Sequence, residues 1–207
     1  MKTKVKGIIF DFGGVLSKPL LPGSIKRMCL VSGINFTGLK ESYIRFRYDY
    51  DRGKISAVEY WRLILDVHHI IPDEQRIKKL IDADVKGWTC INKKMLSFIQ
   101  KIRPNVSRLG ILSNMNWDCL DFVEKNFQWL HIFDALIFSC KIGLNKPELP
   151  IYEYCLDSIG LDPDDCLFID DSEENIAAAA KRGMFTLHFK SFSLFTKELF
   201  GKYSMEL

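Results

Sequence analysis

Short apolar segments alternate with amphipathic ones along most of this chain, and this alternation limits the possible fold more than any other feature. The apolar segments are bounded by glycine or polar residues and have the length of buried strands. They are Val5–Phe10, Leu109–Leu112, Ala135–Phe138, Cys166–Ile169 and Phe185–Phe189. Strands that are apolar on both faces are typical of a parallel sheet covered by helices on both sides.

The segments between these strands carry apolar residues at helical spacing. The predicted helices are Met95–Ile102, Asp118–Phe127, Pro150–Ile159 and Asn175–Arg182. Pro150 at the start of one helix and Gly160 after its end are the residues expected at these two positions. Strands and helices in this alternation predict an α/β fold, a Rossmann-like doubly wound parallel sheet.

One long segment, residues 17–87, interrupts the alternation because its patterns are helical and none is a convincing strand. Ser56 and Glu59 have the spacing of a capping box at a helix start. We therefore expect an inserted all-helical cap over residues 17–87 and a core formed by residues 1–16 and 88–207. A helical insertion after the first strand can serve as a lid over a binding site.

The composition narrows the classes of partner. The chain has 207 residues, with 29 lysines and arginines interleaved among 26 acidic residues, so we expect no nucleic-acid partner. Its apolar runs are much shorter than the roughly 20 residues of a membrane span, and the first is too short for a signal peptide. The six cysteines form no C-x-x-C pair, and we expect free, mostly buried thiols and a cytoplasmic protein without a membrane partner. Nothing in the sequence indicates the oligomeric state.

Polar residues follow the predicted strands at the points where chemistry is expected, because ligands of open parallel sheets bind beyond the carboxyl ends of the strands. These residues are Asp11 after the first strand, Ser113 and Asn114 after the second, Lys146 between the third strand and its helix, and Asp170 and Asp171 after the fourth. Three carboxylates, a hydroxyl and an ammonium group are thus predicted to meet at one edge.

This set of groups favours phosphate chemistry. Three neighbouring carboxylates repel one another unless a cation lies among them, and hard oxygen ligands suit Mg²⁺. The carboxylate of Asp11 could then attack a phosphate ester and form an aspartyl-phosphate. Ser113 and the backbone N–H of Asn114 could bind the phosphoryl oxygens, while Lys146 balances charge.

Four segments carry a resemblance to a known family. IIFDFGGVL, ILSNMN, GLNKPELPIY and LFIDDSEENIAAAAKRG resemble the four ordered motifs of the haloacid dehalogenase superfamily, most closely its subgroup with a helical cap after the first motif. RGKISAVEYW resembles the cap of that subgroup. The resemblance implies that Asp11 is the nucleophile and a Mg²⁺ ligand, and that the backbone carbonyl of Gly13 is a further ligand.

The resemblance also assigns the remaining motif residues. It implies that Ser113, Asn114 and Lys146 bind phosphate, and that Lys146, the lysine of the third motif, is also catalytic. It implies that Asp170 and Asp171 are the acidic pair that binds metal, Asp171 being the better candidate for direct ligation. It further implies a Mg²⁺-dependent phosphomonoesterase whose partner is a small phosphorylated metabolite, such as a sugar phosphate.

The sequence departs from the family at Gly13, where phosphatases of the family carry a second aspartate that protonates the leaving group and activates water. The D-x-G-x-V form of the first motif resembles sugar-1-phosphate phosphatases, whose leaving group needs less acid help. Alternatively, a bound water or a cap residue supplies the proton, Asp49 and Asp51 being candidates. Two other functions stay open: a metal-independent hydrolase of the dehalogenase type, and a catalytically weak or inactive regulatory protein that binds phosphate.

The remaining polar and aromatic residues of the cap have plainer interpretations. Arg45 and Arg47 could contact an anionic substrate, but two arginines on one helix are more often on its solvated face, and we expect them there. Tyr48, Tyr50 and Trp61 are expected to pack within the cap.

Overall fold

The computed structural model describes residues 3–204 of the chain and has at its centre a five-stranded, wholly parallel sheet. In spatial order its strands are β4 (Ala135–Phe138), β3 (Arg108–Ser113), β2 (Gly7–Phe10), β5 (Cys166–Asp170) and β6 (Phe185–His188). The predicted α/β fold is confirmed, and each predicted strand lies within two residues of an observed one. The central strand β2 pairs Phe10 with Ile111 of β3 and with Ile169 of β5.

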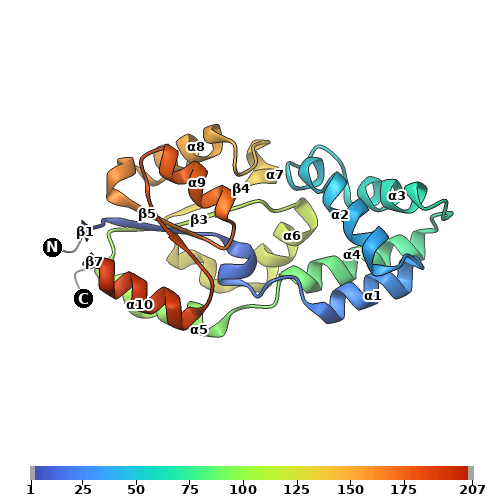
Figure 1. Cartoon of the computed structure of the whole chain (residues 1–207), viewed down its shortest axis with the longest axis horizontal. Helices are drawn as coiled ribbons and strands as arrows, with labels where there is room; N and C mark the ends of the chain where they lie inside the picture. The colour runs from blue at the N-terminus through green and yellow to red at the C-terminus, as the bar shows by residue number, and fades with distance from the viewer. Residues whose placement is uncertain (1–2, 205–207) are drawn as a thin grey trace.

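Helices cover both faces of this sheet, as the apolar character of the strands predicts (Figure 1). The core helices are α5 (Lys93–Ile102), α6 (Trp117–Asn126), the single turn α7 (Ser139–Ile142), α8 (Leu149–Ile159), α9 (Glu173–Lys181) and α10 (Phe192–Lys202). On one face Ile99 of α5 and Phe195 of α10 pack in the same apolar cluster as Ile111. On the other face Ile151 of α8 and Ala179 of α9 pack with Phe168.

The chain ends of the described part meet at the edge of the core. The two-residue strands β1 (Thr3–Lys4) and β7 (Tyr203–Ser204) pair in parallel. Phe195 and Leu199 of α10 are buried, so this C-terminal helix packs on the core. Short irregular turns complete the core: η1 (Phe12–Leu16), η2 (Arg103–Asn105), η3 (Gln128–Ile132) and η4 (Pro163–Asp165).

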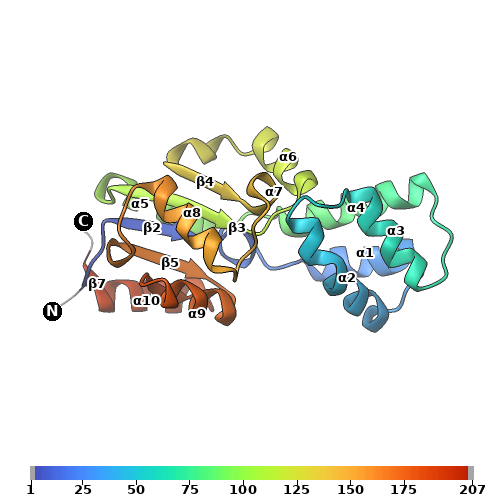
Figure 2. The ribbon, with the colours of Figure 1, turned by 90° about the horizontal axis from the view of Figure 1, so that it is seen from above.

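A four-helix insertion follows β2 and precedes β3, and it lies beyond one end of the sheet (Figure 2). Its helices are α1 (Pro22–Ser32), α2 (Phe36–Asp51), α3 (Ala57–Val67) and α4 (Glu74–Trp88). Tyr50, Tyr60 and Trp61 are fully buried in an apolar cluster that these helices form among themselves. Tyr50 and Trp61 therefore pack within the cap as predicted, whereas Tyr48 is about half exposed, at 47%.

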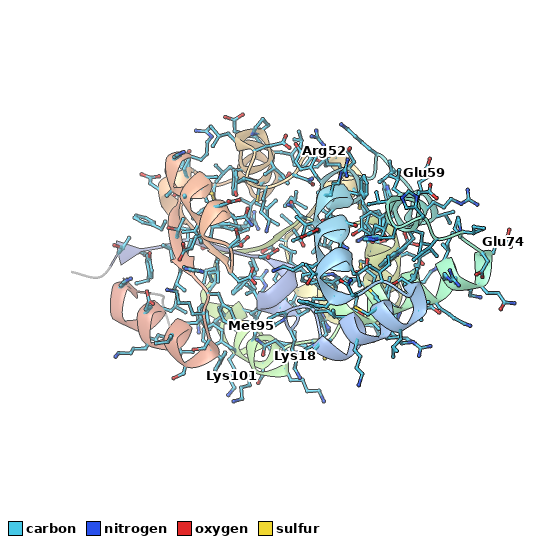
Figure 3. All side chains as sticks on the ribbon, turned by 45° about the vertical axis from the view of Figure 1, so that its right-hand side comes forward. Lys18, Arg52, Glu59, Glu74, Met95 and Lys101 are labelled. Atoms are coloured by element: carbon cyan, nitrogen blue, oxygen red, sulfur yellow. The ribbon has the colours of Figure 1, made fainter. Side chains whose placement is uncertain are left out.

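The predicted capping box at the start of α3 is present. The Ser56 hydroxyl accepts a hydrogen bond from the Glu59 backbone N–H at 3.2 Å, and the Glu59 side chain (labelled in Figure 3) accepts one from the Ser56 backbone N–H at 2.8 Å. Replacing Ser56 with alanine removes one of these bonds, and we expect the Tm to fall by about 2–4 °C. Ser158→Ala, at an exposed serine inside α8, is the matched control in a thermal melt. An unchanged Tm for Ser56→Ala would contradict the assignment.

Hydrogen bonds join the cap to the core both at its base and at its far side. At the base of the cap the two connecting segments run side by side: Lys18 N–H donates to the Cys90 carbonyl at 2.7 Å, and Asn92 N–H donates to the Leu16 carbonyl at 2.8 Å. At the far side the Arg52 side chain donates to the Gly143 carbonyl at 2.8 Å. Figure 3 labels both Lys18 and Arg52. The cap is therefore held against the core at two separated places.

All six cysteines lie within the described residues as free thiols, and four are buried: Cys119, Cys140, Cys155 and Cys166. This agrees with the predicted free and mostly buried thiols. No helix within residues 3–204 has both the length and the apolar character that crossing a membrane requires.

Candidate active site

The turn after the central strand positions Asp11 at the carboxyl edge of the sheet. The Phe12 N–H donates to the Asp11 Oδ1 atom at 2.7 Å, which fixes the carboxylate against its own turn. Gly14 has a φ of +78°, a conformation that favours glycine, and a Cβ there would overlap the Asp171 carboxylate. The turn therefore needs glycine at position 14 to bring Asp171 close to Asp11.

Lys146 is the cation that pairs with two of the carboxylates at this edge of the sheet. Its side chain is almost completely buried, and its Nζ atom lies 2.8 Å from Asp11 Oδ1 and 2.6 Å from Asp170 Oδ2. It also donates to the Leu112 carbonyl at 2.9 Å, so all three N–H groups of the ammonium have partners. Burial alone would lower the pKa of Lys146, but the Asp11 and Asp170 carboxylates outweigh it and raise this pKa above its ordinary value.

Asn114 holds the loop that carries Lys146. Its side-chain amide donates to the Lys146 carbonyl at 2.8 Å and accepts from the Lys146 N–H at 2.8 Å. The neighbouring Ser113 is buried at the end of β3, where its hydroxyl makes only a long bond of 3.4 Å to the Asn114 carbonyl. The Asn114 side chain is thus committed to the loop, while the Ser113 hydroxyl is weakly bound and available to a ligand.

The two acidic residues after β5 have different surroundings. Asp170 is fully buried, and besides Lys146 it accepts hydrogen bonds from Asn175 Nδ2 at 3.1 Å and from the Ser172 N–H at 2.8 Å. Asp171 is exposed. Ser172, not either aspartate, caps α9, so the aspartates are not needed to begin that helix.

The carboxylates of Asp11, Asp170 and Asp171 form one cluster. Each offers one oxygen, and the three oxygens lie within 4.8 Å of one another. Burial, with the nearby acids and against the opposing effect of Lys146, raises the pKa of Asp11 to about 7. Because Lys146 balances only one of three negative charges, and because carboxylate oxygens are ligands that Mg²⁺ prefers, the cluster fits a divalent cation.

A cavity of about 320 Å³ lies over this cluster, between the core and the cap. The predicted site residues that line it are Asp11, Gly13, Ser113, Asn114, Lys146 and Asp171. Asp170 does not line the cavity but is buried beside it, paired with Lys146, so the structure brings all the predicted site residues together.

Trp88, at the end of α4, stands over Gly13. A Cβ added at Gly13 would lie 3.3 Å from the Trp88 ring, closer than ordinary van der Waals contact. The space beside Gly13, where an aspartate would project, is therefore partly taken by an indole ring. Sequence reasoning missed Trp88, and only its place at the end of the cap segment could have indicated a role.

The prediction that Arg47 lies on a solvated face was wrong. Its side chain is 18% exposed and lines the cavity, where it forms ion pairs with Asp51 at 2.9 Å and with Asp84 at 3.0 Å. Two buried carboxylates draw the guanidinium inward. Asp51 lies four residues along the same helix, but the helical pattern of α2 does not reveal Asp84, which is 37 residues away. Arg45 is exposed, as predicted. Of the two candidate acids, Asp51 lines the cavity, whereas Asp49 is exposed and pairs with Lys54.

Comparisons with known proteins agree with this arrangement. The sequence model of the haloacid dehalogenase-like hydrolases matches residues 5–183. A sesquiterpene phosphatase of Aspergillus oryzae is 28% identical over 91% of this chain and 91% of its own length. A D-ribitol-5-phosphate phosphatase of Bacteroides thetaiotaomicron is 25% identical over 88% of this chain and 90% of its own length.

The fold is also similar to that of a solved structure. A HAD family enzyme of Bacteroides thetaiotaomicron, in complex with magnesium and inorganic phosphate, is 25% identical, with a TM-score of 0.74 over 92% of this chain and 98% of that one.

Proposed function

Because this chain belongs to the haloacid dehalogenase-like hydrolase family, we propose that it is a magnesium-dependent phosphomonoesterase that acts on a small phosphorylated organic substrate. The observation that carries the proposal is the cluster of Asp11, Asp170 and Asp171 around the buried Lys146 at the carboxyl edge of the sheet. Relatives that cover about nine-tenths of the chain are phosphatases, which supports the same chemistry.

The proposed reaction has two steps with Asp11 as the nucleophile. A carboxylate oxygen of Asp11 attacks the phosphorus in line with the ester oxygen, whose bond to phosphorus breaks and which leaves with that electron pair. Water then attacks the phosphorus of the aspartyl-phosphate and gives up a proton to the solvent. The bond between phosphorus and Asp11 breaks with its electron pair on Asp11, so the carboxylate is restored and inorganic phosphate leaves. Because Oδ1 already accepts two hydrogen bonds, Oδ2 is the oxygen better placed to attack or to face a cation.

The other residues bind and position. We assign the phosphoryl oxygens to the Ser113 hydroxyl and the Asn114 N–H. Lys146 holds Asp11 in place and balances charge, and because its three N–H groups already have partners, it could contact the phosphoryl group only by giving up one of them.

The proposed ligands of the metal are Asp11, the Gly13 carbonyl, Asp170 and Asp171. Of Asp170 and Asp171, Asp171 is the better candidate for a direct bond to the metal, because Asp170 already accepts hydrogen bonds from Lys146 and Asn175. A Mg²⁺ ion at this place supplies positive charge that stabilises the phosphoryl group during transfer.

Gly13 limits the leaving groups that the proposed substrate can have. It has no side chain to protonate a leaving group, and Asp51, the candidate acid in the cavity, is engaged by Arg47 and by Asn116. We therefore infer a leaving group that departs without a proton, such as an aryl oxygen or the anomeric oxygen of a sugar.

The alternatives from the sequence have less support. A halide site gains nothing from three neighbouring carboxylates, which disfavours the metal-independent dehalogenase. An inactive phosphate-binding protein is motivated only by Gly13. We further propose that residues 17–87 act as one cap on the core of residues 1–16 and 88–207. The cytoplasmic location and the absence of a nucleic-acid partner stay predictions.

Hydrolysis of para-nitrophenyl phosphate with Mg²⁺ and with EDTA tests the proposed function. We expect turnover that EDTA abolishes and that added Mg²⁺ restores. Asp171→Asn removes one carboxylate from the cluster, and we expect it to raise the Mg²⁺ concentration for half-maximal turnover at least about tenfold. Asp164→Asn, at an exposed aspartate near the opposite edge of the sheet, is the control. Equal turnover in EDTA would rule out the metal-dependent reaction.

A further inference from the structure

We infer that the cavity selects the phosphate ester of an uncharged, mainly apolar organic group over esters that carry a second anion or many hydroxyls. This inference rests on the proposed phosphatase function and adds a substrate class to it. Three observations carry it: the charge of the cap wall, the hydrogen bonds of its polar groups, and its apolar surface.

Arg47 is the cation of the cap wall, by which we mean the part of the cavity lining that the cap contributes. A second anionic group on a substrate would need this arginine as its partner. Its guanidinium already pairs with Asp51 at 2.9 Å and with Asp84 at 3.0 Å. Burial alone would lower the pKa of Arg47, but these carboxylates outweigh it and hold the pKa well above its ordinary value. One cation against two carboxylates leaves this group negative, so a second anion on the substrate would be repelled.

Three polar groups of the wall, those of Tyr43, Trp88 and Thr89, already have hydrogen-bond partners within the protein. The Tyr43 hydroxyl donates to Asp84 and accepts from Arg47 Nη1 at 2.6 Å and from Trp88 Nε1 at 2.8 Å. This uses the full hydrogen-bonding capacity of that hydroxyl and the single donor of the indole. Thr89 likewise donates to the Val85 carbonyl at 2.7 Å. A substrate rich in hydroxyls would lose its hydrogen bonds to water on entering and gain few in return.

The remaining wall is apolar. Ile44 and the Tyr43 ring face the cavity from α2, and the Trp88 ring faces it from the end of α4. Met115 and Cys119 face it from the core. Arg47 is itself flanked by aromatic rings, its Cζ atom lying 5.1 Å from the Tyr43 centroid and 5.7 Å from the Trp88 centroid. A cavity of about 320 Å³ with such walls suits an apolar group of modest size, and an aryl group also meets the leaving-group requirement that Gly13 sets.

Two matched pairs of substrates test the inference by their kcat/KM values. Phenyl phosphate and para-carboxyphenyl phosphate both release a phenol and differ in charge. Diethylphenyl phosphate and bis(hydroxymethyl)phenyl phosphate, both substituted at the two meta positions, also release a phenol, have nearly the same size and differ in hydroxyl groups. We expect the first member of each pair to be favoured at least about tenfold. Equal values, or a preference for the second member, would overturn the inference.

Asp84→Asn tests the charge argument directly, because it removes one of the two negative partners of Arg47 at nearly constant size. We expect the preference for phenyl over para-carboxyphenyl phosphate to shrink at least about threefold. Asp82→Asn, at an exposed position of the same helix, should leave that preference unchanged. If Asp84→Asn does not fold, Asp51→Asn makes the same test from the other partner. An unchanged preference in a folded variant would show that Arg47 is not masked by these acids.

The same assays distinguish a wrong substrate class from a wrong proposed function. If para-nitrophenyl phosphate and all four esters are inert with Mg²⁺ present, the phosphatase itself is wrong, and with it the substrate class. If para-nitrophenyl phosphate is hydrolysed while the two pairs show no preference, the phosphatase stands and only the inferred substrate class is wrong.

Discussion

Replacing Asp11 with asparagine is expected to lower the kcat for para-nitrophenyl phosphate at least about 10⁴-fold, because the amide has the shape of the carboxylate and lacks its nucleophilic oxygen. The change removes one of the three clustered carboxylates and weakens the bond that Lys146 donates to Oδ1. The fold should survive, since the Phe12 N–H still has an oxygen acceptor at position 11. Steady-state assays with Mg²⁺, beside circular dichroism of the same preparation, check the result.

Asp164→Asn is the matched control for Asp11→Asn, because Asp164 precedes β5 at the amino edge of the sheet and is exposed. It should retain the activity of the unchanged protein. Turnover by Asp11→Asn within tenfold of that activity would exclude Asp11 as the nucleophile, and either water or another residue would then have to attack the phosphorus.

Replacing Lys146 with methionine is expected to lower the free energy of unfolding by about 3–5 kcal/mol in EDTA, because it leaves the buried carboxylates of Asp11 and Asp170 without their counter-charge. Lowering the pH should reduce this loss, since a protonated carboxyl group needs no counter-charge. Mg²⁺ should stabilise the variant more than it stabilises the unchanged protein, since the cation binds the folded cluster and not the unfolded chain. Urea unfolding with and without Mg²⁺, at two pH values, measures all three effects.

Lys141→Met provides the control for Lys146→Met. Lys141 is an exposed lysine that pairs with Glu124 at the surface, and its loss should change the free energy of unfolding by less than about 0.5 kcal/mol. If Lys146→Met were as stable in EDTA as the unchanged protein, the three carboxylates would not be held together by charge balance, and the case for a cation among them would weaken.

The core could be predicted from the sequence because its rules are local. A parallel strand buried on both faces is a short apolar run, and the polar residue that ends it is visible beside it, as Asp11 is after Phe10 and Asp170 after Ile169. Parallel pairing then brings these ends to one edge without any knowledge of strand order. The predicted residues therefore meet in the structure even though up to 160 residues separate them.

The wall of the cavity could not be predicted in this way, because its partners come from different elements with no shared period. Arg47 of α2 meets Asp84 of α4, and Trp88 of α4 stands over Gly13 of the core. A helical pattern shows which face of a helix is apolar, but not which buried acid turns a charged residue inward. Asn114 is a similar case, since its side chain holds the Lys146 loop instead of beginning the helix that follows.

Gly13 links the structure to the kinetics of the proposed reaction. With no carboxylate at this position and the Trp88 ring beside it, the chain offers no base there to activate the water of the second step. An activated aryl ester loses its leaving group readily in the first step, so hydrolysis of the aspartyl-phosphate should be the slower step. The phosphorylated enzyme should then accumulate during turnover.

The most direct test of Asp11 as the nucleophile is mass spectrometry of the protein quenched in acid during hydrolysis of para-nitrophenyl phosphate with Mg²⁺. We predict a rapid release of para-nitrophenol in amounts close to that of the enzyme, and one added phosphoryl group on the peptide that contains Asp11. Asp11→Asn should show neither. Metal-dependent turnover with no phosphorylated peptide, or with the phosphoryl group on another residue, would contradict the mechanism.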